Sequence, residues 1–130
     1  MSENRPTVML VDDSAATRTF FAQLAEKCTF DLHACAAADE ATTLLDAHVP
    51  DIIFLNVMMP GKDGYTFLRE VRTRGALGAT PVVIITSKDY AQDRAAARDL
   101  GVNEFLAKPV TGLEIKALVD KYCLQSAARD

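Results

Sequence analysis

Two adjacent aspartates, Asp12 and Asp13, directly follow the apolar run Val8–Val11. Paired carboxylates at the end of a strand supply the hard oxygen ligands that Mg²⁺ prefers when it keeps several waters and is completed by a phosphate. The same pair would also suit the N-terminus of a following helix, by capping it and interacting favourably with its dipole. Taken alone, the pair leaves metal binding and helix capping equally open.

Three further polar residues, Asn56, Thr86 and Lys108, each end a later apolar run. A hydroxyl and a mobile ammonium are the groups expected around a phosphoryl oxygen. Taken singly, however, Thr86 reads as an ordinary strand residue and Lys108 as a solvated surface amine. Their meaning depends on whether the fold brings them to the acidic pair.

The elements that must position these residues are predicted from apolar periodicity. Continuous apolar runs of four residues are typical of parallel strands buried on both faces, and alternating apolar and polar residues indicate a half-exposed edge strand. The predicted strands are Val8–Val11, Phe30–Ala34 (the edge strand), Ile52–Leu55, Val82–Ile85 and Phe105–Ala107, and segments of helical period lie at Phe20–Leu24, Ala41–Leu45, Phe67–Val71, Ala95–Leu100 and Leu113–Val119.

Helix boundaries are predicted from capping residues. Asp39 is expected before the second helix, Gly101 is expected to close the fourth, and Thr111 with Glu114 forms a capping-box pattern at the fifth. Alternating strands and helices with short connections predict an α/β fold with a doubly wound parallel sheet and right-handed crossovers. Ligands bind such sheets outside the carboxyl ends of the strands, where the strand order reverses, so the five polar residues are expected to form one site there.

Length and composition limit the classes of protein. The chain has 130 residues, of which 49% are apolar and 25% charged, so we expect a single domain over 1–130 with a core of about 6–124. A net charge of −4 with interspersed basic residues argues against nucleic acid. The apolar runs are too short to span a bilayer and the first residues do not resemble a signal peptide, so we expect a cytoplasmic protein without membrane contact.

The cysteines and histidines do not predict a metal site. Cys28, Cys35 and Cys123 are odd in number and lack zinc-ligand spacing, so they are interpreted as buried reduced thiols. His33 and His48 are each isolated in the sequence, so both are interpreted as structural or solvent-facing residues.

The stretch Pro50–Gly64 resembles the centre of a bacterial two-component response-regulator receiver domain, in which an aspartate would occupy position 56. The resemblance covers essentially the whole chain, because the acidic pair, the strand-end residue, the hydroxyl and a lysine followed by Pro109 occur in order at the expected strand ends. It implies a flavodoxin-like (βα)5 receiver fold with a five-stranded parallel sheet in the order 2-1-3-4-5.

The resemblance also implies roles for single residues. Asp13 would bind Mg²⁺ directly, Asp12 would hold it through water, and the carbonyl of Met58 would complete the protein ligands beside Asn56. Asn56 takes the phosphoacceptor position. Met58, together with Lys88 two residues after the predicted hydroxyl, also flanks the site.

Thr86 and Lys108 would contact phosphoryl oxygens, and Thr86 and Phe105 would form the switch that reports the state of the site. Phe105 is equally well explained as a core aromatic, and because it has no hydroxyl its switching would act through packing alone. Pro109 would follow a cis peptide that fixes the direction of Lys108.

Asn56 changes the expected chemistry. Phosphoryl transfer needs a carboxylate nucleophile, whereas a carboxamide is neutral and its oxygen is a poor nucleophile. Replacing a carboxylate also removes an anionic metal ligand, so Mg²⁺ is expected to bind more weakly. Since Asn and Asp have nearly the same shape, we predict a correctly folded receiver that stays close to its unphosphorylated conformation.

The function predicted from these residues is a single-domain response regulator, a phosphate-gated switch rather than an enzyme. It would dock a histidine kinase or histidine phosphotransfer protein and bind a downstream protein through its fourth helix, fifth strand and fifth helix, around Lys88–Asp99, Phe105 and Thr111–Lys121. If the chain is a fragment, an effector domain has been cut away.

The alternative is a natural pseudo-receiver, an interaction module that ignores phosphate. Asn56 is accordingly either a laboratory substitution or a natural residue, and the retention of Asp12, Asp13, Thr86 and Lys108 favours the first. Two enzymatic or cofactor classes fit poorly. Haloacid-dehalogenase phosphatases need Asp-x-Asp where this chain has Asp12-Asp13-Ser14. A flavodoxin-like flavin site needs a Gly/Ser/Thr-rich phosphate loop after the first strand, and the segment Ser14–Arg18 has no glycine.

Overall fold

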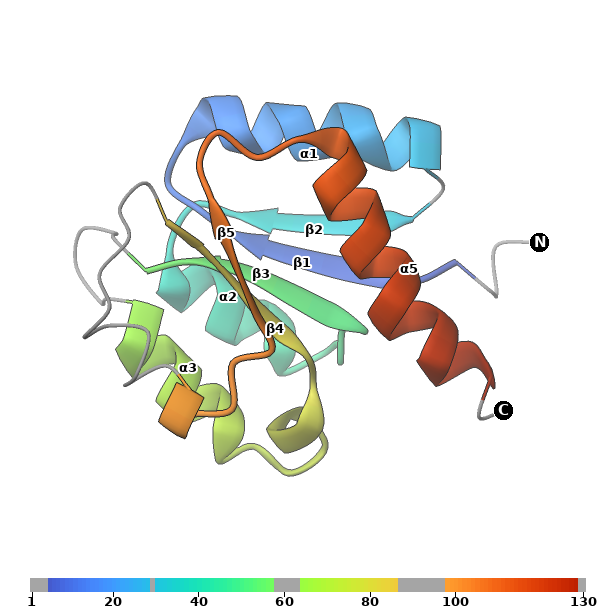
Figure 1. Cartoon of the computed structure of the whole chain (residues 1–130). Helices are drawn as coiled ribbons and strands as arrows, with labels where there is room; N and C mark the ends of the chain where they lie inside the picture. The colour runs from blue at the N-terminus through green and yellow to red at the C-terminus, as the bar shows by residue number, and fades with distance from the viewer. Residues whose placement is uncertain (1–4, 29, 58–63, 87–97, 129–130) are drawn as a thin grey trace.

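The computed structural model describes residues 5–28, 30–57, 64–86 and 98–128, apart from the side chains of residues 76 and 124–128. Within these ranges five parallel strands form one sheet in the order β2-β1-β3-β4-β5 (Figure 1). The strands are β1 (Thr7–Val11), β2 (Asp31–Cys35), β3 (Ile52–Asn56), β4 (Val82–Thr86) and β5 (Glu104–Ala107). The predicted fold class and strand order are therefore confirmed.

Helices connect the strands and cover both faces of the sheet. They are α1 (Ala15–Cys28), α2 (Ala38–Leu45), α3 (Gly64–Arg72) and α5 (Gly112–Ala128), with a short 3-10 helix, η2 (Gly75–Ala79), before β4. The first half of the predicted helix at Ala95–Leu100, residues 95–97, lies outside the described residues. Its end is described, and Gly101 there adopts a φ of 76°, as the prediction of a closing glycine requires. No helix of the described part is long and apolar enough to cross a membrane.

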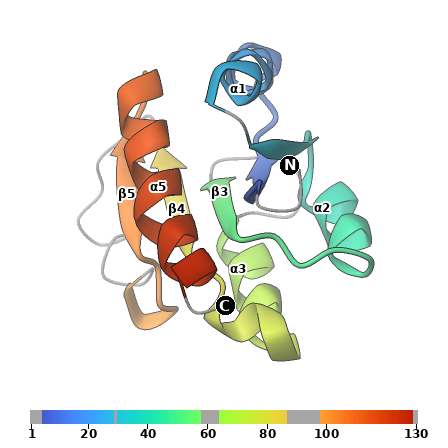
Figure 2. The same cartoon turned by 90° about the vertical axis from the view of Figure 1, so that its right-hand side faces the viewer.

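Helices lie on both sides of the sheet (Figure 2), and an apolar layer on each side joins them to it. On one face Phe21 of α1 and Ile115 of α5 pack against the sheet beside Phe54. On the other face Phe67 of α3 packs with α2 against alternate strand residues, including Ile53. The central strand β3 is buried along its whole length, as a continuous apolar run between two helical layers predicts.

The two predicted caps differ in outcome. At α5 the Thr111 hydroxyl accepts the Glu114 N–H at 3.2 Å while Glu114 Oε1 accepts the Thr111 N–H at 2.9 Å, so the capping box is confirmed. The cap predicted at Asp39 is wrong, because α2 begins at Ala38 and its N-cap residue, Ala37, makes no side-chain hydrogen bond. Asp39 instead lies in the first turn, where its negative charge interacts favourably with the helix dipole.

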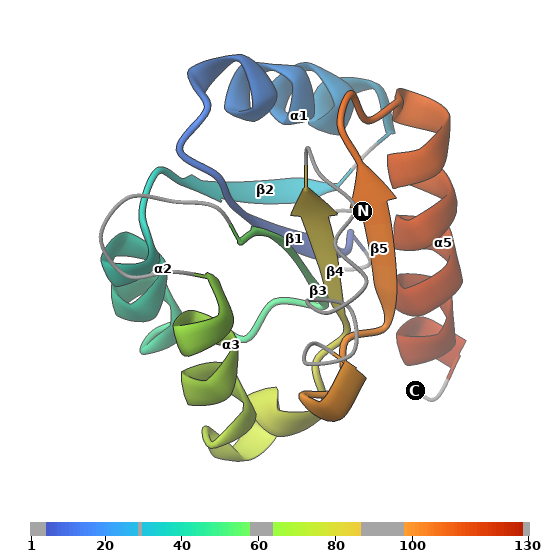
Figure 3. The ribbon, with the colours of Figure 1, turned by 60° about the vertical axis from the view of Figure 1, so that its left-hand side comes forward.

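Parallel pairing brings the carboxyl ends of the strands to one edge, as the neighbouring arrowheads of β4 and β5 show (Figure 3). Asn56 pairs in register with Ile85, and Thr86 pairs with Ala107. Gly64, at the start of α3, lies against the end of β3, since a Cβ there would come within 2.5 Å of Val57 Cα. A glycine is required at that contact, which fixes α3 beside the edge.

Candidate functional site

Asp12 lies fully buried at the end of β1. Its backbone N–H donates to Cys35 O at 2.9 Å, which continues the pairing of β1 with β2 by one residue. Its Oδ1 accepts the Ser14 N–H at 2.9 Å. Buried carboxylates are stable only when hydrogen-bonded or ion-paired, so the contacts of Asp12 define the site.

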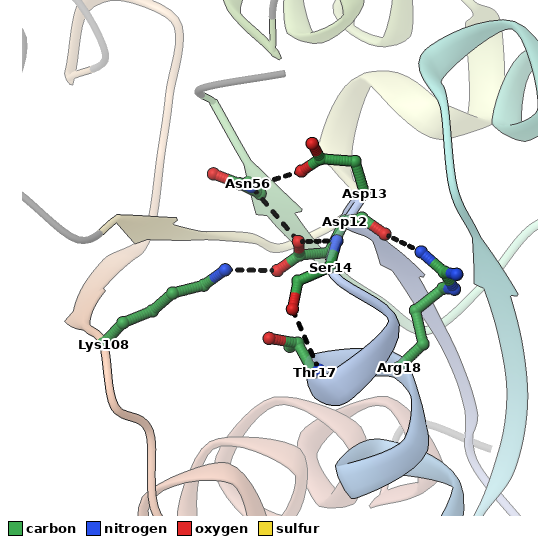
Figure 4. A network of polar contacts seen from close by, with 7 residues as sticks. All are labelled: Asp12, Asp13, Ser14, Thr17, Arg18, Asn56 and Lys108. Atoms are coloured by element: carbon green, nitrogen blue, oxygen red, sulfur yellow. Dashed lines mark hydrogen bonds and ion pairs between the residues drawn. The ribbon is translucent and has the colours of Figure 1, made fainter. Parts of the chain in front are cut away.

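Asn56 is the residue that joins the acidic pair. It ends β3 with 6% of its surface exposed. Its Nδ2 donates to Asp12 Oδ1 and to Asp13 Oδ1, each at 3.2 Å (Figure 4). The opposite orientation of the amide would place its oxygen against two carboxylate oxygens, so the charges determine which atom faces the acids.

Lys108 reaches the same site from the loop after β5. Its Nζ lies 2.9 Å from Asp12 Oδ2 and its side chain is 23% exposed. Within the described residues Asp12 Oδ2 accepts no hydrogen bond, so the charge of this carboxylate is compensated by the ion pair with the Lys108 ammonium. The Lys108 N–H donates to Thr86 O at 2.9 Å, and the Lys108–Pro109 peptide is cis, as the resemblance implied.

Thr86 and Phe105 lie at the same edge of the sheet. Thr86 ends β4 one residue beyond the partner of Asn56. Phe105 pairs with Ile84 and packs, partly buried, against the apolar layer that contains α2 and α3. Because side chains alternate along a strand, Thr86 lies on the same face of the sheet as Ile84 and Phe105. The structure thus brings together Asp12, Asp13, Asn56 and Lys108 by direct contacts, and Thr86 and Phe105 by strand register.

The start of α1 also contributes contacts to the site. Ser14, not an aspartate, caps α1 by accepting the Thr17 N–H at 3.3 Å. The Arg18 guanidinium donates a hydrogen bond to Asp12 O at 2.9 Å, so a side chain of α1 fixes the backbone of the buried acid (Figure 4). A serine three residues before Thr17 was a signal available in the sequence.

The remaining residues singled out in the sequence are Met58, Lys88 and the three cysteines. Met58 and Lys88 fall outside the described residues. The three cysteines are free thiols as predicted, although Cys28 is half-buried rather than buried. Burial raises the pKa of the Cys35 and Cys123 thiols to about 12.

The two histidines, which are isolated in the sequence, meet in the fold. The rings of His33 and His48 stack with centroids 5.0 Å apart, because β2 and the turn after α2 lie at the same edge of the sheet. The separation of 15 positions in the chain hid this contact. Within the described part of the chain, no three His, Cys, Asp or Glu residues gather as a metal site.

The donor set around Asn56 fits Mg²⁺. Asp12 and Asp13 present carboxylate oxygens close together, which suits a hard cation that keeps several waters. The amide, however, turns its nitrogen rather than its oxygen toward them. Among the described residues Asp12 and Asp13 are therefore two anionic ligands for such an ion, and the Asn56 amide already donates a hydrogen bond to each.

The model of the response regulator receiver domain family matches residues 8–120. The chain belongs to this family. Protein PilG of Pseudomonas aeruginosa is similar to this receiver domain, with 35% identity over 109 residues, which are 83% of this chain and 80% of PilG. Receiver domains are signalling units of two-component systems, which agrees with the predicted class.

Solved structures share the fold of this receiver domain. Chemotaxis protein CheY4 of Vibrio cholerae superimposes with a TM-score of 0.86 at 21% identity, over 91% of this chain and 98% of CheY4. The receiver domain of sensor histidine kinase PA1611 from Pseudomonas aeruginosa has a TM-score of 0.82 at 22% identity, over 92% and 98% of the two chains. That structure holds a magnesium ion in its active-site cleft.

Proposed function

We propose that this chain is a response-regulator receiver that cannot be phosphorylated at position 56 and stays close to the unphosphorylated conformation. The observation that carries the proposal is the placement of Asn56. Its side chain occupies the buried end of β3, in contact with Asp12 and Asp13. An acceptor carboxylate at this position would lie among the residues that handle phosphate, and the amide has no nucleophilic oxygen to offer.

The roles of the surrounding residues follow from the chemistry of phosphoryl transfer. Asp12 and Asp13 would hold Mg²⁺, which supplies positive charge beside phosphoryl oxygens. Lys108, already 2.9 Å from Asp12, is placed to contact the same oxygens. Thr86 and Phe105 form the switch pair, supported by their shared face of the sheet. We propose that Asn56 weakens the metal site because it contributes no charge.

The phosphodonor would be a histidine kinase or a histidine phosphotransfer protein. A mostly apolar hollow of about 480 Å³ lies beside Lys108, between the start of α1 and the loop before α5. It is lined by Ala16, Thr17, Phe20, Lys108, Pro109 and Val110. A donor seated there brings its phosphohistidine to the site, so we propose this hollow as part of the docking surface.

Output would pass through β5 and α5, by protein contact and without nucleic acid. β5 and α5 are joined there by Glu104, whose Oε2 accepts the Tyr122 hydroxyl at 2.7 Å and the Lys121 ammonium at 2.9 Å. Most of Lys88–Asp99, the third part of the predicted output face, lies outside the described residues. We further propose that the chain folds as one domain with a core of about 6–124, and works in the cytoplasm as is typical of the family.

Phosphorylation tests the proposal directly. The chain and its Asn56→Asp variant are incubated with acetyl phosphate and Mg²⁺, and intact mass is measured. The variant should gain one phosphate and the chain should gain none. A stoichiometric adduct on Asn56 itself would refute the proposal.

A second candidate, the pseudo-receiver, is favoured by one observation: the acids of this site are already paired by the chain's own groups. Partner binding by the chain and by Asn56→Asp, each with and without beryllofluoride and Mg²⁺, separates the two. A phosphate-gated switch responds in the Asp form, whereas a pseudo-receiver binds equally in all four conditions.

A further inference from the structure

We propose that the Asn56 carboxamide takes the place of a divalent cation, so that the acidic pair is held together without metal. The inference rests on the proposed placement of the metal at Asp12 and Asp13. It does not depend on whether residue 56 can accept phosphate. It concerns regulation of the same site by the residue that distinguishes this chain.

The first support is the geometry of the amide. A carboxamide nitrogen carries two N–H groups. In this structure Nδ2 lies 3.2 Å from one oxygen of Asp12 and 3.2 Å from one oxygen of Asp13. One group therefore bridges two carboxylates from between them, which is the position that a shared cation takes.

The second support is the compensation of the buried acid by protein groups. Asp12 Oδ1 also accepts the Ser14 N–H, and Asp12 Oδ2 faces the Lys108 ammonium. Both oxygens of a fully buried carboxylate are thereby compensated by protein groups. An aspartate at position 56 would have no hydrogen to donate and would add a third negative charge in the same space, which a cation must then offset.

Asn56 should therefore weaken metal binding in two separate ways. It lacks the carboxylate ligand, and it also donates two hydrogen bonds to charged acceptors that an incoming ion must break. The second effect distinguishes the inference from simple loss of a ligand. A residue with a neutral side chain that has no N–H groups should leave Asp12 and Asp13 more available to Mg²⁺ than Asn56 does.

The test is calorimetric titration with Mg²⁺ at constant ionic strength, on the chain and on Asn56→Ala and Asn56→Asp. We expect Asn56→Asp to bind most tightly and Asn56→Ala to bind about threefold to tenfold more tightly than the chain, since hydrogen bonds to charged groups are lost. Binding by Asn56→Ala that is equal to or weaker than that of the chain would overturn the inference.

Asn56→Val serves as a second donor-free variant, because it fills more of the space and suits a strand, and it decides the outcome if Asn56→Ala does not fold. Thermal unfolding gives an independent measurement. In EDTA the chain should unfold at a higher temperature than Asn56→Asp, and Mg²⁺ should raise the midpoint of Asn56→Asp most and that of the chain least. A chain stabilised by Mg²⁺ as much as Asn56→Asp contradicts the inference. Neither an amide nor a methyl side chain accepts phosphate, so the comparison of the chain with Asn56→Ala stands apart from the phosphorylation assay.

Discussion

Arg72, at the end of α3, binds the segments before β4 and β5 together. Its guanidinium donates to Gly78 O, Thr80 O, Leu100 O and Gly101 O at 2.7–3.2 Å. Burial lowers the pKa of Arg72, yet an arginine stays protonated at neutral pH. One side chain therefore satisfies four backbone carbonyls at the edge of the sheet that lies away from Asn56.

We expect Arg72→Ala to lower the free energy of unfolding by about 2–4 kcal/mol, because these carbonyls lose a charged donor. Urea denaturation followed by circular dichroism measures the change. Arg74→Ala is the matched control. It breaks the ion pair with Asp46 at 2.7 Å, in which both partners are partly exposed, and should cost less than about 1 kcal/mol. Equal losses in the two variants would contradict this account.

The thiols should differ in reactivity. Burial holds the pKa of Cys35 and Cys123 at about 12, so at pH 8 roughly one in ten thousand of each is a thiolate. Cys28 is only half-buried. Ellman's reagent should therefore modify Cys28 first in the native protein, and Cys28→Ser should remove the fast phase. Modification of Cys35 at the same rate as Cys28 would disagree with its burial.

Residue types at strand ends were enough to predict which residues approach Asn56, but not how they approach. The acidic pair, the amide and the lysine were all anticipated. The direction of the amide was not, because it depends on the charges of two neighbours that only folding brings together. The same reason explains the missed stacking of His33 and His48.

At the scale of elements, Glu104 joins β5 to α5. Hydrogen bonds from Lys121 and then Tyr122 lower the pKa of Glu104. A carboxylate whose pKa is lower in the folded state stabilises the protein above the unfolded pKa of about 4.3, and this stabilisation is lost as the pH falls through the folded value. The β5–α5 contact should therefore weaken in acid.

We expect Glu104→Gln to lower the midpoint of thermal unfolding at pH 7, and the difference from the parent chain to vanish as the pH is lowered toward about 3. Asp120→Asn is the control, since Asp120 pairs with Lys116 on an exposed helical face and should change stability little. A difference for Glu104→Gln that persists in acid would show that its contribution is packing rather than charge.

Elements with strong periodicity were predicted well, and their ends less well. The buried strands and the Thr111 cap followed from local sequence. Leu113 was counted with the apolar residues of the last helix, yet it is 83% exposed, because the buried face of α5 runs through Ile115, Val119 and Cys123. The helical period therefore predicts that Leu113 belongs to a helix, but it does not predict whether a residue of the first turn faces the core or the solvent.

At the scale of the whole molecule, one sheet carries both apolar layers. Residues of β1, β3 and β4 contribute to each layer by alternation. The helices on one face of the sheet cannot detach without exposing the strands against which the helices on the other face pack. The chain should therefore unfold as a single cooperative unit.

Tyrosine fluorescence tests this, because the chain has no tryptophan. Tyr65 packs against the layer with α2 and α3, and Tyr122 against the layer with α1 and α5. Two variants each keep one of these tyrosines and have the other tyrosines changed to Phe. In each variant the urea midpoint measured by tyrosine fluorescence should equal the midpoint measured by circular dichroism. Different midpoints for the two layers would show that they unfold separately.

The small exposed fraction of Asn56, 6%, has a consequence for recognition. A protein that seats itself on this edge meets almost the same contour whether an amide or an acid lies beneath. Under the proposed function, recognition by a phosphodonor and acceptance of phosphate are therefore separate properties of this chain. We expect it to act as a decoy, which occupies a phosphodonor without discharging it and so keeps that donor from competent receivers.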